Sequence, residues 1–171
     1  MGKQVLVDLK KANIIYAILQ LLLTFIFFII KINVEHILSF KIRWYMIVYI
    51  IFIVFSHEGL HGIGFKFIGK AEWKDINYGI QKKYLNPYCT CKNLFLTKGQ
   101  YIGTMLLPNI VLSILSIMIM IKSRNLFWTL IAGLVIASGT GDYYMIYLVS
   151  KYPKGTKFMD HPTEPGFYVI E

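Results

Sequence analysis

The chain has 171 residues, of which 56% are hydrophobic and 16% are charged, and its formal net charge at pH 7 is +9. The apolar share is too high for an ordinary soluble domain and indicates a membrane protein, whose length fits one domain over residues 1–171. The basic residues lie between apolar runs and form no basic helix or base-reading motif, so we expect contact with membrane lipid and no nucleic-acid partner. Cys89 and Cys91 provide no disulfide framework and are interpreted as ordinary thiols.

The first predicted transmembrane helix spans residues 13–30, an apolar run long enough to cross the hydrocarbon core of a bilayer. It follows a basic segment that we expect at the membrane interface. No small-residue cleavage site follows the run, so we expect a retained membrane helix rather than a cleaved signal peptide. His36 lies in the polar connector that comes next and is interpreted as a solvated side chain.

The second predicted helix spans residues 44–67 and begins with aromatic residues typical of a membrane interface. Residues 68–100 form a long polar loop. Within it, residues 75–81 alternate polar and apolar side chains and residues 84–90 are rich in β-prone types, which predicts a β-hairpin or two edge strands. An open strand edge is suited to capture an extended peptide by β-addition, and a plain cytoplasmic loop is the alternative.

The third predicted helix spans residues 101–121 and contains Pro108, which frees a backbone carbonyl one turn earlier. The fourth spans residues 126–150, and the tail, residues 151–171, is rich in proline and glycine and not helical in character. These elements predict an all-α membrane protein with about four transmembrane helices. A small cytoplasmic β-hairpin-like insertion lies between the second and third helices.

The distribution of basic residues predicts the orientation of these helices. Thirteen of the 18 basic residues lie on or beside three segments: the N-terminal segment, the long polar loop and the tail. If the chain crosses the membrane four times, these three segments lie on the same side. Basic residues favour the cytoplasmic side. We therefore predict a multi-pass protein of the cell membrane with both termini in the cytoplasm.

Residues 57–61 read H-E-x-x-H inside the apolar second helix. His57 and His61, four residues apart, lie on one helical face and can hold one zinc ion, and Glu58 can reach a water molecule there as a general base. Ionisable groups at membrane depth are costly and usually mark a functional site. A structural, hydrogen-bonded histidine–glutamate pair is the alternative.

Asp142 is the single carboxylate of the fourth predicted helix and the candidate third ligand, because catalytic zinc typically has three protein ligands. His57 lies nine residues before Lys66. Asp142 lies nine residues before Lys151. At about 1.5 Å per residue, both side chains are ~13 Å from a basic flank and can meet at one depth. An interhelical hydrogen bond is the alternative role for Asp142, and His161 in the tail is a reserve ligand.

These features resemble the bacterial "putative zincin peptidases", a family of small membrane proteins. The resemblance covers about residues 44–150 and is carried by the H-E-x-x-H motif, the Gly141-Asp142 pair and the run Lys98–Pro108, which has the family's order of basic, glutamine, aromatic, apolar and proline residues. The layout is more distantly similar to site-2-type intramembrane metalloproteases, which pair H-E-x-x-H with an aspartate from a later helix. That similarity implies the same zinc ligands and the same base.

We therefore predict a zinc metallopeptidase embedded in the membrane, which hydrolyses peptide bonds of membrane-associated or transmembrane substrates near the cytosolic face. Zinc would be held by His57, His61 and Asp142, with Glu58 as the catalytic base. The alternative is a zinc-binding membrane protein without proteolytic activity, such as a regulator or an immunity-type protein. A transporter that uses these ionisable groups as a proton or ion path is a second alternative.

Overall fold

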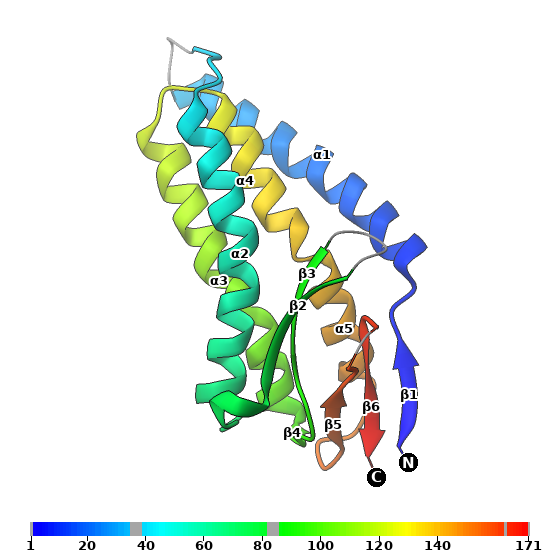
Figure 1. Cartoon of the computed structure of the whole chain (residues 1–171). Coiled ribbons are helices and arrows are strands. Elements are labelled where there is room, and N and C mark those ends of the chain that lie inside the picture. Colours follow the sequence, from blue (N-terminus) through cyan, green and yellow to red (C-terminus); the bar gives the residue numbers. More distant parts are fainter. Residues whose placement is uncertain (1, 35–38, 82–85, 163, 171) are drawn as a thin grey trace. The chain divides into compact units, whose positions relative to one another are not determined.

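The computed structural model describes residues 2–34, 39–81, 86–162 and 164–170, so the interpretation of His36 lies outside the described residues. The helices, labelled in Figure 1, are α1 (Leu9–Val34), α2 (Trp44–Phe67), α3 (Lys98–Lys122), α4 (Phe127–Ser138) and α5 (Thr140–Ser150). The strands are β1 (Lys3–Leu6), β2 (Ile76–Gln81), β3 (Asn86–Cys91), β4 (Leu96–Thr97), β5 (Lys157–Asp160) and β6 (Gly166–Ile170). The chain divides into two compact units. The site unit comprises Met1–Asp8, Val54–Pro108 and Gly141–Glu171, and the helical unit comprises Leu9–Ile53 and Asn109–Thr140.

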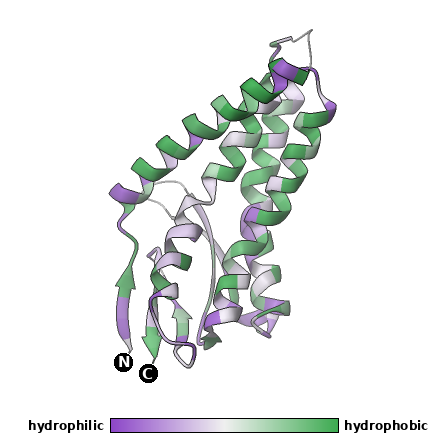
Figure 2. Ribbon diagram, turned by 180° about the vertical axis from the view of Figure 1, so that it is seen from behind, coloured by the Kyte–Doolittle hydropathy of each residue, from purple (hydrophilic) through white to green (hydrophobic). Residues whose placement is uncertain are grey.

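In the helical unit, α1 packs closely against α4. A Cβ atom on Gly133 would lie 2.7 Å from the Oγ1 atom of Thr24, so this close approach requires glycine. The hydroxyls of Tyr49 on α2 and Ser116 on α3 share a hydrogen bond of 2.9 Å. Large apolar side chains such as Phe25 remain exposed on the long helices, which are predominantly hydrophobic in Figure 2. Such a surface is suited to contact with lipid.

Three helices are long and apolar enough to cross a membrane: α1, α2 and α3. They confirm the three predicted apolar helices within a few residues at each end. The fourth predicted helix, 126–150, differs: it is divided at Gly139 into α4 and α5, so the prediction of four transmembrane helices is not confirmed. Hydroxyl groups explain the division, because Ser138 and Thr140 donate hydrogen bonds to carbonyls three residues earlier and so compete with the helical backbone.

The predicted hairpin is present as β2 and β3, which pair antiparallel with Tyr78 opposite Cys89. The site unit also contains a four-stranded sheet in the order β1-β6-β5-β4, which the sequence analysis did not predict. The N-terminal segment forms β1, with Lys3 opposite Val169 in the tail, and its expected position at the membrane interface stays a prediction. The all-α prediction is therefore wrong for both ends of the chain.

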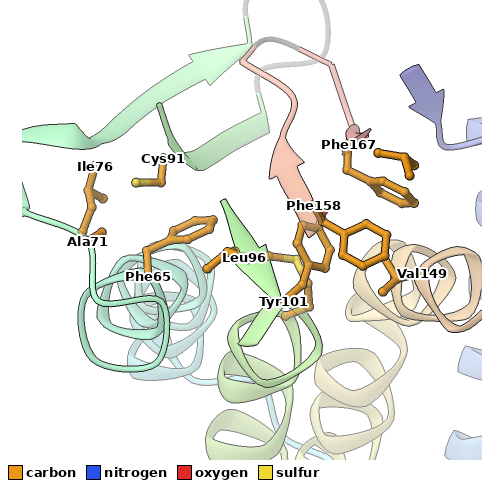
Figure 3. Packing of buried hydrophobic residues seen from close by; sticks show 11 residues of the cluster. Phe65, Ala71, Ile76, Cys91, Leu96, Tyr101, Val149, Phe158 and Phe167 are labelled. Atoms are coloured by element: carbon orange, nitrogen blue, oxygen red, sulfur yellow. The ribbon is translucent and has the colours of Figure 1, made fainter. Parts of the chain in front are cut away.

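An aromatic core joins the sheet to the helices of the site unit. Tyr101 of α3 packs against both Phe158 of β5 and Phe167 of β6, with ring centroids 5.9 and 5.6 Å away (Figure 3). Phe65 of α2 and Val149 of α5 belong to the same buried cluster. Because three helices share this core with strands β2 to β6, packing against the strands holds the helical segments of the site unit together.

We predict that Phe158→Ala lowers the free energy of unfolding by about 3–5 kcal/mol, because the fully buried ring leaves a cavity. The measurement is denaturant unfolding of the detergent-solubilised protein. Phe25→Ala on α1, where the ring is 63% exposed, is the matched control and should cost much less. Equal losses in the two variants would contradict the assigned core.

Candidate metal centre

Three potential metal ligands converge in the site unit. His57 and His61 come from α2, and Asp142 comes from the first turn of α5. The Nε2 atom of His57 lies 3.1 Å from Oδ2 of Asp142 and 3.2 Å from Nε2 of His61. The Nε2 atom of His61 lies 3.4 Å from Oδ1 of Asp142. The structure thus brings together the three ligand residues predicted from the sequence.

A backbone carbonyl of α3 fixes the orientation of His61. The Nδ1 atom of His61 lies 3.2 Å from the carbonyl oxygen of Thr104. A carbonyl can only accept, so Nδ1 donates a proton to it, and Nε2 is the ring nitrogen that faces His57 and Asp142. Such a hydrogen bond to the second ring nitrogen is typical of metal-binding histidines.

Two residues make this contact possible. Pro108 lies four residues after Thr104 on α3 and has no N–H group, so the Thr104 carbonyl lacks its usual helical partner. Gly64 on α2 allows the helices to approach, because a Cβ atom there would lie 3.0 Å from the Thr104 side chain. The sequence analysis predicted a freed carbonyl but did not identify its recipient, which is His61.

The donor atoms fit a zinc ion in both type and spacing. Tetrahedral zinc binds nitrogen and oxygen at about 2.0–2.1 Å, which places neighbouring ligand atoms about 3.3 Å apart. The Nε2 atom of His57 lies 3.1 Å from Oδ2 of Asp142 and 3.2 Å from Nε2 of His61, and one ligand atom from each of the three residues lies within 4.8 Å of the others. Two imidazoles and one carboxylate, held by two helices, therefore provide three of the four positions of a tetrahedral site.

Glu58 lies beside this group on α2, half-buried, and is not one of the three converging residues. The hairpin lies near this residue, because the Glu58 carboxylate contributes to raising the pKa of the Cys89 thiol in β3. Glu58 has the position that H-E-x-x-H gives to a base: next to the first histidine and outside the ligand set.

The structure places the reserve ligand His161 elsewhere. Its Nδ1 atom accepts a hydrogen bond of 2.8 Å from the backbone N–H of Glu164, and its Nε2 atom lies 3.0 Å from the side-chain amide of Gln4 in β1. Among the described residues, His161 belongs to no cluster of potential metal ligands. Its ring joins β1 to the tail, and the structure does not bring it together with the three converging residues.

The two cysteines are free thiols, as interpreted from the sequence. Burial and the nearby Glu58 carboxylate raise the pKa of Cys89 well above its usual range. Burial also raises the pKa of Cys91, to about 11. Both thiols stay protonated at neutral pH and are poor nucleophiles.

Asp160, at the end of β5, was not singled out by the sequence analysis. Its Oδ1 atom accepts a hydrogen bond of 3.4 Å from the hydroxyl of Tyr101. Burial raises the pKa of Asp160 from 3.8 to about 7, although hydrogen bonds from Thr90 and Tyr101 oppose the increase. No local pattern in the tail marked this residue, because its partners lie 59 and 70 positions away in the sequence.

A motif-bearing helix whose two histidines meet a carboxylate from a later helix forms a candidate centre of the zinc-peptidase class. Comparison with protein families agrees: the family described as "putative zincin peptidase" matches residues 47–157, and the chain belongs to this family. The predicted family is confirmed. Comparison with curated proteins and with solved structures gave no match. The similarity to site-2-type metalloproteases stays a prediction.

We predict that Pro108→Ala weakens zinc binding about tenfold, because the restored N–H competes with His61 for the Thr104 carbonyl. The same change should not destabilise the fold, since alanine is a better helix former than proline. Zinc affinity is measured by competition with a chromogenic chelator, with Ile110→Ala on the same helix as the control. Unchanged zinc affinity in Pro108→Ala would remove the Thr104 carbonyl from the support of the site.

We predict that Asp160 makes the free energy of unfolding depend on pH. Its folded-state pKa of about 7 exceeds its ordinary value of 3.8, so between these pH values the folded protein binds a proton that the unfolded chain has released. This contribution is complete below about pH 4 and is lost as the pH rises to 7. Asp160→Asn should reduce the fall in the free energy of unfolding between about pH 4 and pH 7. The measurement is unfolding in detergent at several pH values. Exposed Glu164→Gln is the control and should retain it.

Proposed function

We propose that this protein is a membrane-embedded zinc metallopeptidase that hydrolyses peptide bonds of membrane-associated or transmembrane substrates near the cytosolic face. The observation that carries this proposal is the convergence of His57, His61 and Asp142 beside Glu58. A purely structural zinc site has four protein ligands and no use for a base, whereas this group offers three ligands and an adjacent carboxylate. Membership of the zincin peptidase family supports the same function.

The roles of the residues follow from their positions. His57, His61 and Asp142 would hold zinc, and His61 is oriented for this by the Thr104 carbonyl. When bound, zinc polarises the scissile carbonyl and lowers the pKa of the attacking water. Glu58 takes the proton of that water and transfers it to the leaving amine.

The open edge of β3 is the proposed binding surface for an extended substrate. The N–H of Lys92 donates to the carbonyl of Asp75 at 3.1 Å, so these two residues form a hydrogen-bonded pair. Hydrogen-bonded and non-hydrogen-bonded pairs alternate along an antiparallel ladder, and the register therefore makes Tyr78 and Cys89 a non-hydrogen-bonded pair. The backbone groups of Cys89 consequently point away from β2, to the outer edge of β3, where we propose that a substrate strand pairs.

The proposed location is the cell membrane, with both termini in the cytoplasm. The three long apolar helices support a membrane protein, and the excess of basic residues around the termini and the polar loop supports the orientation. In this orientation the hairpin and the sheet face the cytosol, together with their substrate. The proposed partners are membrane lipid and a membrane-associated or transmembrane peptide or protein substrate.

We predict about one zinc ion per chain in the purified wild type and a clear loss of zinc in Asp142→Ala, because two histidines alone form an incomplete site. Glu58→Gln should keep its zinc but lose cleavage of a peptide library by a factor of about 10²–10⁴, the usual contribution of a general base. The measurements are metal analysis and product detection, both by mass spectrometry.

Glu72→Gln is the matched control, because Glu72 is exposed and pairs only with Lys74 among the contacts described. It should retain zinc and cleavage. Full cleavage by Glu58→Gln would remove Glu58 from the role of base. A wild type that holds zinc and cleaves none of the peptides would favour the non-proteolytic regulator.

A further inference from the structure

The run Lys98–Pro108 opens with a lysine and a glutamine that the proposed mechanism does not use. Both lie in the first turn of α3, which begins at Lys98. Their side chains bind the C-terminal ends of the two helices that carry the candidate metal ligands: α2 with His57 and His61, and α5 with Asp142. The first turn of α3 therefore contacts both ligand-bearing helices of the site unit.

Lys98 holds the C-terminal end of α5. Its Nζ atom donates hydrogen bonds to the carbonyl oxygens of Ser150 and Tyr152, each at 2.7 Å. The last carbonyls of a helix have no amide partner within it, and positive charge is favourable at this end. Asp142 lies eight residues before Ser150 on the same helix, ~12 Å along its axis. Because the rise of a helix is fixed, the position of its last turn determines the level of Asp142.

Gln100 holds the C-terminal end of α2. Its Nε2 atom donates a hydrogen bond of 3.0 Å to the carbonyl oxygen of Ile68, the residue that follows α2. Its Oε1 atom accepts hydrogen bonds of 3.0 Å from both the backbone N–H and the hydroxyl of Thr97. The side-chain amide is thus fixed on both sides. His61 lies seven residues before Ile68, ~10 Å along the chain of the helix.

One turn further along, α3 contacts α2 a second time. The carbonyl of Thr104, four residues after Gln100, accepts the hydrogen bond from His61 at 3.2 Å. Helix α2 is therefore bonded to α3 at two levels, and α5 is bonded to the same first turn by Lys98. With α3 as the common reference, two side chains two positions apart determine the axial positions of α2 and α5.

We propose that Lys98 and Gln100 are positioning residues for the metal centre and form an α3 clamp that sets the spacing between Asp142 and the two histidines. The inference rests on the proposed function in taking these three residues as zinc ligands. Neither clamp residue belongs to the ligand set. Ligands must keep their places within about 0.5 Å for a metal of defined geometry, so loss of either clamp contact should disturb the bound metal.

The first test removes the contact with α5. Lys98→Met deletes the ammonium and keeps a long side chain, and zinc affinity should fall about tenfold, as for other residues that orient ligands. Saturating cobalt(II) replaces zinc as a probe, because its visible absorption depends on coordination geometry, and this absorption should also fall. Lys98→Arg keeps the charge and the donors and should restore both properties. Lys154→Met, exposed in the tail, loses the same charge and is the matched control.

The second test removes the contact with α2. Gln100→Glu keeps an acceptor for Thr97 and loses the donor to the Ile68 carbonyl. Its zinc affinity should also fall about tenfold, with a weaker cobalt absorption. Both metals are titrated in detergent against a chromogenic chelator. Denaturant unfolding of each variant gives the folded fraction, so that the affinities refer to folded protein.

The outcomes separate the clamp from the proposed function. Wild-type affinity and absorption in either Lys98→Met or Gln100→Glu would overturn the clamp, even with lower stability, because one contact cannot set the spacing of two helices. If Lys98→Met does not fold, Gln100→Glu decides by the same criteria. A wild type that binds neither metal would overturn both the clamp and the peptidase. A wild type that binds zinc and cleaves no peptide would overturn the peptidase alone.

Discussion

The hydrogen bond from His61 to the Thr104 carbonyl is the interaction on which the candidate metal centre depends. It determines which ring nitrogen of His61 carries the proton, and so directs the other toward His57 and Asp142. An ordinary α-helix has no spare carbonyl in its interior, because each is bonded to the amide four residues later. Pro108 removes that amide, and α3 supports the site through its backbone rather than through a ligand.

Support for this geometry extends beyond the helices. The buried cluster that includes Phe65 and Tyr101 joins α2 and α3 to β5 and β6, and Val149 brings α5 into the same core. The helix that carries Asp142 is thus held by the strands of the tail. Ligand atoms must keep their spacing within a few tenths of an ångström, so a segment remote from the metal contributes to the site through packing.

Much of the site was predictable because its signals are local. Apolar runs located α1, α2 and α3, the four-residue spacing located the histidines, and a count of helical residues put Asp142 at the same depth as His57. The sheet was missed because its pairings are distant in sequence: Lys3 lies opposite Val169. The division at Gly139 was missed because the apolar residues on either side read as one long helix, and the bonding of the Ser138 and Thr140 hydroxyls to the backbone is seen only in the structure.

The pairing of β1 with β6 also has a consequence for how the protein is made. The histidines of α2 emerge from the ribosome about 100 residues before β6, and β1 waits for its partner across almost the whole sequence. Long-range pairing of this kind forms late in folding. A partly synthesised chain therefore has its two histidines before the sheet and Asp142 exist, so we expect the metal centre to stay incomplete until residues 142–170 have been synthesised.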